Sequence, residues 1–474
     1  MREAARTGVR GLVRSAALGK SRGAIVARMA FASIATRGFS VVASLLTVPI
    51  VLHHLGAERY GLWTATLALA GLFTIADGGI ANSLISHVSR AHGAGDRAAI
   101  RVLIGSGLAA TAAFGLAFIP LVLIAVHFVN WTWAFNLPDA AMGREAGFVI
   151  ASICLCYALG LPATVIRQAR LGLLQGTAVS LWDLAATIVS VGALVVAVLL
   201  GGGITVMAVV WAAVLALARS ASAVIFLIGS GRDIRPSWRD VRPAACRVLI
   251  ASGVVVLLYT LSQAFAVQSD QILIARLSGI KAVTAYAIVQ RLFNQPQILM
   301  TMFLAAQWPA YGEALGRGDD EWIRRHFIRT LIVLTACAAV ACLAIALLCD
   351  EILYVWIGSA VVASPALIAA MAVYGVVTAA ANTFSFFYLS LRMNRRVVIA
   401  QTAMLAIALP VSILLIPRFG SPGAAVGPIV GYLAAIVIPG ILMLDRTLAS
   451  VPAFRGGVFL DIREPASQPV SAGG

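Results

Sequence analysis

The sequence predicts an all-α integral membrane protein with about twelve transmembrane helices in two halves. Hydrophobic residues make up 61% of the 474-residue chain and charged residues only 11%, whereas soluble domains carry about 25% charged residues. A membrane-spanning helix needs about 20 apolar residues. Stretches of that kind occupy residues 30–52, 62–84, 102–126, 147–166, 178–200, 204–228, 248–274, 282–306, 330–348, 363–389, 397–416 and 423–444.

The positions of the basic residues predict the membrane topology. The chain holds 35 basic residues, and all but two of them are arginine. If the amino terminus is cytoplasmic, the inside connections carry 17 of them and the outside connections carry five. This bias is the positive-inside signature of a multi-pass protein. It predicts a cell inner-membrane location with both termini in the cytoplasm, because the number of spans is even.

The net charge of +16 does not indicate nucleic acid. The charge lies in short connections beside apolar spans, where it can meet anionic lipid head groups. The six cysteines show no zinc-ligand spacing and are interpreted as small apolar fillers. We expect no metal and no cofactor.

The chain divides into five segments. Residues 1–29 form a basic cytoplasmic segment without a cleavable signal sequence, either an amphipathic surface helix or a disordered tail. Residues 30–228 and 248–444 form the two six-helix bundles, and the basic linker 229–247 joins them. The polar tail 445–474 is predicted to be disordered.

An internal repeat supports the two halves. Gly93, Gly95, Asp96, Ile100 and Arg101 each match an identical residue 223 positions later, after the second and eighth spans. Two repeats in the same orientation are a transporter architecture. The alternative is chance similarity between two glycine-containing loops.

Three arginines lie inside apolar spans, where each costs about 2.5–3.5 kcal/mol unless it faces water or a partner. They are Arg37, Arg219 and Arg291. Each of the three spans that hold these arginines is next in sequence to a span with a single carboxylate. The expected ion pairs are Arg37–Asp77, Arg219–Asp183 and Arg291–Asp270. These pairs are either structural clamps with snorkelling arginines or parts of a functional site. We weigh the two readings equally for Arg37–Asp77 and favour function for Arg291.

The span that holds Arg291 also carries a polar stripe. Gln290, Asn294, Gln297 and Thr301 recur at helical spacing, and the preceding span presents Tyr259, Gln263 and Asp270 on one face. A helix that is polar along one side at membrane depth should line a water-filled cavity. Hydrogen bonding between helices in a dry bundle is the alternative.

No enzyme motif is present: the chain has no GxSxG, no HExxH and no Walker loop. A membrane glycosyltransferase or polysaccharide polymerase would need a larger outside loop than 127–146, or a soluble domain. The sequence therefore favours a protein that is not an enzyme.

Two stretches resemble a known family. Residues 55–63, LGAERYGLW, lead to Asp77-Gly78-Gly79-Ile80, and residues 270–277, DQILIARL, lead to Val283-Thr284-Ala285-Tyr286. Together they resemble the Wzx-type polysaccharide flippases of the multidrug/oligosaccharidyl-lipid/polysaccharide exporter superfamily. Many relatives read Asp-Leu-Gly where this chain reads Asp77-Gly78-Gly79. The resemblance implies two six-helix bundles around a central cavity.

It also implies the function. We expect a flippase that moves an undecaprenyl-diphosphate-linked oligosaccharide to the periplasmic leaflet by alternating access, for O-antigen or exopolysaccharide biosynthesis. Guanidinium groups bind diphosphates bidentately. The arginines are therefore the candidate diphosphate or sugar-acid contacts, the amides the candidate sugar contacts, and the three aspartates the candidate ion-pair or coupling residues.

Expected partners are this substrate and membrane lipids. A coupling cation, a polysaccharide polymerase and glycosyltransferases are further candidate partners. The alternative function is a cation-coupled multidrug or metabolite exporter of the same superfamily, which would favour a carboxylate-lined aromatic cavity over an arginine-bearing one.

Overall fold

The computed structural model describes residues 22–73, 78–317, 319–358, 361–391 and 393–444. Within these ranges the chain is helical except for short turns, and it contains no strand. The N-terminal half, here the N-lobe, comprises α2 (Arg22–Phe73), α3 (Gly78–Gly93), α4 (Arg97–Phe128), α5 (Trp131–Ala134), α6 (Ala140–Gly172), α7 (Gly176–Leu199) and α8 (Ile204–Ile228).

The C-terminal half, here the C-lobe, follows two short 3₁₀ turns, η1 (Arg232–Ile234) and η2 (Trp238–Asp240). It comprises α9 (Pro243–Ser278), α10 (Ile280–Arg317), α11 (Asp320–Leu347), α12 (Cys349–Ile357), α13 (Pro365–Ser390), α14 (Asn394–Phe419), α15 (Ser421–Tyr432), the π-helical turn η4 (Leu433–Val437) and α16 (Ile438–Leu442).

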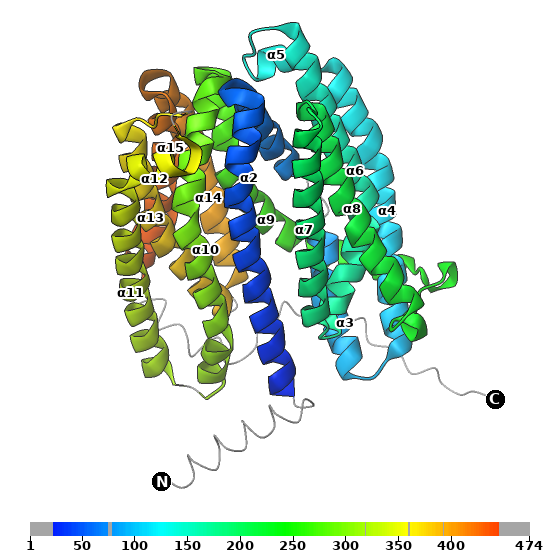
Figure 1. The fold of residues 1–474 in the computed structure, drawn as a ribbon. Helices are drawn as coiled ribbons and strands as arrows, with labels where there is room; N and C mark the ends of the chain where they lie inside the picture. Colours follow the sequence, from blue (N-terminus) through cyan, green and yellow to red (C-terminus); the bar gives the residue numbers. More distant parts are fainter. Residues whose placement is uncertain (1–21, 74–77, 318, 359–360, 392, 445–474) are drawn as a thin grey trace, which may run out of the picture.

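The helices gather into two groups (Figure 1). Helices α4, α6, α7 and α8 form one group, and α10, α11, α13 and α14 form the other. The long α2 stands between them and packs against both α7 and α10. The two-bundle, all-α fold predicted from the sequence is confirmed.

Each predicted span falls at least partly on a helix, but the bounds differ. Nine helices in the described ranges are long and apolar enough to cross a membrane by length and composition. The first two predicted spans share one of them, because α2 continues through a reversal of the chain at Gly56. The second predicted span, 62–84, passes from α2 into α3 through residues 74–77, which lie outside the described residues.

Several helices continue beyond the apolar stretches that predicted them. Helix α6 extends to Gly172, so Arg167 and Arg170 belong to a helix and not to the predicted inside connection. Likewise α9 begins at Pro243, so the end of the predicted linker 229–247 is helical. Hydropathy marks where a helix meets lipid, whereas helix length depends on the stop signals that follow.

The 223-residue repeat extends to backbone geometry. Gly56 has φ 77° and ψ 167°, and Gly279, 223 positions later, has φ 89° and ψ 161°. Positive φ is open to glycine and strained for other residues, so both sharp reversals need glycine. At the same offset, Asp96 and Asp319 each cap a helix by accepting a hydrogen bond from the backbone N–H three residues on.

The lobes meet closely where α3 crosses α9. A Cβ atom added at Gly79 would lie 2.2 Å from the backbone oxygen of Gly253. Ser83 Oγ also donates a hydrogen bond to the Leu249 carbonyl, at 3.2 Å. The Asp77-Gly78-Gly79 sequence, which departs from the family's Asp-Leu-Gly, therefore ends in a glycine that this crossing requires.

Replacement of Gly79 by alanine should destabilise the fold by about 1–3 kcal/mol, because the new methyl group meets backbone that cannot move aside without separating the helices. The measurement is the thermal unfolding midpoint in detergent. Gly192→Ala in α7 is the matched control, since nothing lies within 4 Å of a Cβ there. Equal midpoints for the two variants would contradict the prediction.

The lobes also meet through α2. Thr284 Oγ1 donates to the Ala57 carbonyl, and a Cβ at Gly61 would lie 2.2 Å from the Ile280 carbonyl oxygen. Trp356 Nε1, on α12, donates to the Leu45 carbonyl at 2.9 Å. The Leu45 carbonyl needs a hydrogen-bond donor from another helix, because Pro49, four residues later, has no N–H to donate.

Candidate functional site

Three cavities adjoin one another between and within the lobes. The N-lobe cavity, about 490 Å³, is lined by Leu67, Tyr157, Arg167, Trp211, Arg219 and other N-lobe residues. The bridging cavity, about 200 Å³, is lined by Ser44, Thr47, Tyr60, Leu67, Trp211 and Arg291 among others. The interface cavity, about 220 Å³, is lined by residues of both lobes, including Tyr60, Leu67, Gln268, Gln271, Gln290, Arg291 and Asn294.

Leu67 lines all three cavities, and Trp211 lines the N-lobe and bridging cavities. The three spaces therefore adjoin one another along α2. No aspartate or glutamate lines any of the three among the described residues. Within the described part of the chain, the charged groups on these walls are Arg167, Arg219 and Arg291. A space of about 20 Å³ next to the N-lobe cavity shares Arg167 and Arg219 with it and is also lined by Asp183 and Arg170.

Arg291 spans the two lobes. It projects from α10 of the C-lobe, and its Nε donates a hydrogen bond to Ser44 Oγ on α2 at 3.0 Å. The side chain also interacts with the Tyr60 hydroxyl. Arg291 lines both the bridging and the interface cavities, so this residue borders the space that a ligand would enter.

The sequence left open whether the polar stripe on α10 lines a cavity or makes hydrogen bonds between helices. Different residues of the stripe do each. Gln290 and Asn294 line the interface cavity, and Gln290 Oε1 accepts a hydrogen bond from Gln271 Nε2 at 3.0 Å. Gln297 instead turns into the C-lobe, where its Nε2 donates to the Gly375 carbonyl at 2.6 Å. Gln297 is therefore a helix–helix contact. Gln263 lies in α9, and the placement of its side chain is outside the described residues.

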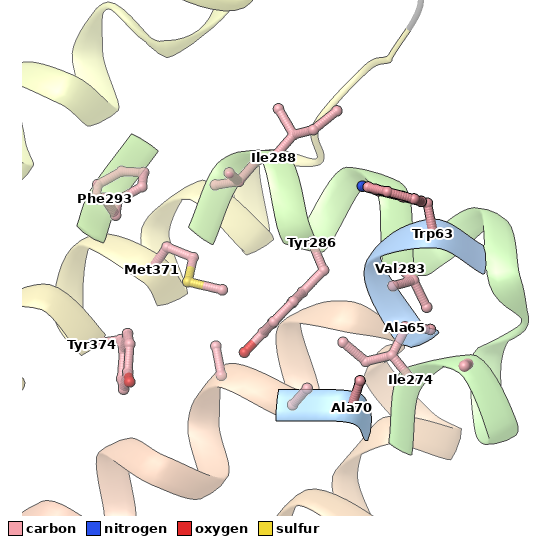
Figure 2. Close-up of a cluster of buried hydrophobic side chains, with 14 of the residues drawn as sticks. Trp63, Ala65, Ala70, Ile274, Val283, Tyr286, Ile288, Phe293, Met371 and Tyr374 are labelled. Atoms are coloured by element: carbon pink, nitrogen blue, oxygen red, sulfur yellow. The ribbon is translucent and has the colours of Figure 1, made fainter. Parts of the chain in front are cut away.

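The predicted Asp270–Arg291 pair is wrong. Asp270 is 2% exposed, and its carboxylate accepts a hydrogen bond from the Tyr286 hydroxyl at 2.6 Å. Figure 2 shows Tyr286 at the centre of a buried cluster, with Tyr374 of α13 to one side and Trp63 of α2 to the other. Asp270 thus belongs to the interior of the C-lobe, while Arg291 faces α2.

The predicted Asp183–Arg219 pair is also wrong in its partner. Asp183, on α7, binds Arg167 of α6 with both carboxylate oxygens, and the closest contact is 2.7 Å. Arg219, on α8, interacts electrostatically with both residues, but its buried Nε has no hydrogen-bond partner among the described residues. The sequence missed Arg167 because this residue lies just beyond the apolar stretch 147–166.

Arg170 is a second basic residue that the sequence assigned to a connection. It is only 6% exposed, its NH1 donates to Ser222 Oγ at 2.8 Å, and its guanidinium lies 5.1 Å from the centre of the Phe226 ring. Its buried Nε has no hydrogen-bond partner among the described residues. Arg167, Arg170 and Arg219 are named the N-lobe arginine cluster below.

Replacement of Asp183 by asparagine should cost about 1–3 kcal/mol of stability, because Arg167 then keeps its charge in a partly buried place without a carboxylate. The measurement is again the thermal midpoint. The double variant Asp183→Asn with Arg167→Gln should recover part of the loss. A double variant that loses the sum of both single effects would show that the pair is not coupled.

Arg37 lies in the exposed part of α2. Its predicted partner Asp77 falls outside the described residues, so the Arg37–Asp77 pair stays a prediction. Among the described residues, no group of three or more His, Cys, Asp or Glu side chains could hold a metal ion.

Comparison with known proteins places the fold. An inward-facing multidrug resistance MATE family transporter of the MOP superfamily superimposes with a TM-score of 0.71 at 16% identity, covering 87% of this chain and 96% of that one. An outward-facing MATE family transporter gives 0.61 at 15% identity, covering 90% and 96%. A MOP superfamily transporter from Pyrococcus furiosus gives 0.63 at 16% identity, with the same coverage.

At these identities the likeness concerns the fold, and it confirms the two-bundle architecture of a multi-pass membrane protein. No curated protein sequence matches the chain significantly. The family model described as polysaccharide biosynthesis protein matches residues 26–314, which is more than half of the chain. The chain therefore belongs to the polysaccharide biosynthesis protein family.

Proposed function

We propose that this protein is a flippase for an undecaprenyl-diphosphate-linked oligosaccharide. It moves the saccharide and diphosphate from the cytoplasmic to the periplasmic leaflet of the inner membrane by alternating access, with both termini cytoplasmic, and serves the synthesis of surface polysaccharide. The observation that carries the proposal is the set of three adjoining cavities along α2, whose charged lining groups in the described residues are all arginines.

The chemistry of these walls suits the ligand. Arg291 offers guanidinium donors that match a phosphate oxygen pair, and its position beside α2 lies where the lobes meet. Gln271, Gln290 and Asn294 supply amide donors and acceptors for sugar hydroxyls nearby.

Membership in a polysaccharide biosynthesis family supports a saccharide cargo. The comparison structures support transport as the activity, because the proteins in them are described as transporters. The protein from Pyrococcus furiosus is described as having a binding pocket of reversed polarity that suggests a different function. Pocket charge is thus the property by which we separate candidate functions within this fold.

A cation-coupled multidrug exporter is the second candidate. The fold likeness to multidrug resistance transporters favours it, and so does Asp270, a buried carboxylate that could bind a coupling cation. Cationic drugs need acidic or aromatic walls, and arginines repel them. The arginine-bearing cavity therefore favours the flippase.

Reconstitution separates the two functions. Proteoliposomes containing a fluorescent undecaprenyl-diphosphate oligosaccharide should expose it to an impermeant quencher on the far leaflet faster than protein-free liposomes do. Ethidium accumulation, with and without a sodium or proton gradient, tests the exporter. Gradient-driven ethidium transport without movement of the lipid-linked sugar would overturn the proposal.

A further inference from the structure

We propose that the saccharide carried by this protein bears an anionic group of its own, a carboxylate or a phosphate on a sugar, and that the N-lobe arginine cluster binds it. The inference rests on the proposed function and specifies its substrate class. It separates two anion sites. Arg291 serves the diphosphate, and Arg167 and Arg219, which line the N-lobe cavity, serve the acidic sugar, with the charge of Arg170 behind them.

The charge balance of the cluster motivates this assignment. Three guanidinium groups gather around one carboxylate, Asp183, and that carboxylate is already held by Arg167 through both oxygens. The other two arginines leave an excess of positive charge inside the helical bundle. Charges at membrane depth are costly unless a partner or water compensates them, so the excess indicates a site for an anion.

Unused donors point the same way. The Nε groups of Arg170 and Arg219 are both buried without a hydrogen-bond partner among the described residues. Arg170 is held in place by Ser222 and by the ring of Phe226. Buried donors are nearly always satisfied by protein, water or a ligand, so these two arginines keep donors that a water molecule or an anion can use.

The location of the cluster selects the sugar end of the substrate. The lipid tail stays in the bilayer, so the diphosphate attached to it must remain near the junction of the lobes, where Arg291 lies between α10 and α2. Arg167 and Arg219 line the N-lobe cavity, which is formed only by N-lobe helices. Trp211 adjoins both this cavity and the bridging cavity, and its ring offers an apolar surface to a sugar that passes between them.

A structural role is the competing explanation. Arg170 occupies the last turn of α6, where a cation interacts favourably with the helix dipole, and arginines near helix ends can extend toward the interface. That role needs no ligand and predicts no preference between acidic and neutral sugars.

Binding of three matched probes by the purified full-length protein decides between these readings. Each probe is a short-chain prenyl-diphosphate trisaccharide, and its terminal sugar is glucose, glucuronic acid or glucose phosphate. We expect one or both acidic probes to bind at least about tenfold more tightly than the glucose probe, the ratio for one charge-assisted contact. The preference should fall as salt is raised.

Equal affinity for all three probes would overturn this inference and leave the flippase proposal standing. Absence of binding by all three would overturn the proposed function itself. These outcomes need only the unaltered protein, so they do not depend on whether a variant folds.

Variants then locate the site. Arg219→Gln and Arg170→Gln should remove the preference for the acidic probe while leaving affinity for the glucose probe nearly unchanged. Arg291→Gln should weaken all probes by a similar factor. Arg276→Gln, at an arginine that stacks on Trp133 outside the three cavities, should change neither quantity. A preference that survives in the Arg219 and Arg170 variants would contradict the assignment to this cluster.

Discussion

Cells that depend on this protein should lose most of their surface polysaccharide when Arg291 is replaced by alanine. The substitution removes the guanidinium that lines both the bridging and interface cavities. It also removes the hydrogen bond to Ser44 that links α10 to α2. A hydrogen bond to a charged group contributes about 1.5–3 kcal/mol, which corresponds to tenfold or more in transport for each lost phosphate contact.

Two further substitutions sharpen this experiment. Arg291→Lys keeps the charge but cannot form the paired guanidinium contacts, so its activity should lie between that of the unaltered protein and that of the alanine variant. Arg276→Ala removes an arginine outside the cavities and should leave polysaccharide unchanged. Undiminished polysaccharide in the Arg291→Ala strain, at equal protein level in the membrane, would reject a role for Arg291.

Spans and halves were predictable because they depend on composition over long windows. A span of about 20 apolar residues has no stable alternative to a membrane helix, and the backbone must satisfy its own hydrogen bonds there. The repeat was visible for a related reason. Asp96 and Asp319, which belong to the repeat seen in the sequence, cap equivalent helices. The structure adds Gly56 and Gly279, which share a positive φ at the same offset.

Ion-pair partners were not predictable, because depth along a helix says nothing about direction around it. Tyr286 and Arg291 are five residues apart on α10, which separates their side chains by about 140° around the axis. Tyr286 and Gln290 therefore face α9, where they meet Asp270 and Gln271, while Arg291 faces α2. Asp270 and Arg291 looked like partners because they lie on spans that are neighbours in sequence, but their side chains point to different neighbours.

Arg167 was missed for a different reason. The apolar stretch ends at residue 166, but α6 continues to Gly172. The sequence signals for that longer helix are the glycines at 172 and 176 and the absence of glycine or proline from residues 167–171. A helix predicted to end at these glycines would have included Arg167 and Arg170 at its inner end, near Asp183. The excess of positive charge in the N-lobe would then have been predictable.

Replacement of Trp356 by phenylalanine should shift the protein toward an outward-open state. Pro49 leaves the Leu45 carbonyl without its helical donor, and Trp356 Nε1 supplies the replacement across the lobe boundary at 2.9 Å. This bond holds α12 against α2 on the side predicted to face the periplasm. Phenylalanine keeps the ring but leaves the carbonyl unsatisfied, at a cost of about 1–3 kcal/mol.

A cost of 1.4 kcal/mol changes the ratio of two conformations tenfold, so the shift is large enough to see by chemical labelling. Thr47 lines the bridging cavity, and a cysteine placed there in a background without the six native cysteines reports access from outside. Its reaction with an impermeant maleimide should be about tenfold faster in the Trp356→Phe variant. Trp133→Phe, at an outer tryptophan that is 64% exposed, is the matched control and should leave the rate unchanged. Equal rates in the two variants would mean that the indole bond does not hold the lobes together, and closure on that side would then rest on the close contact of Gly61 with Ile280.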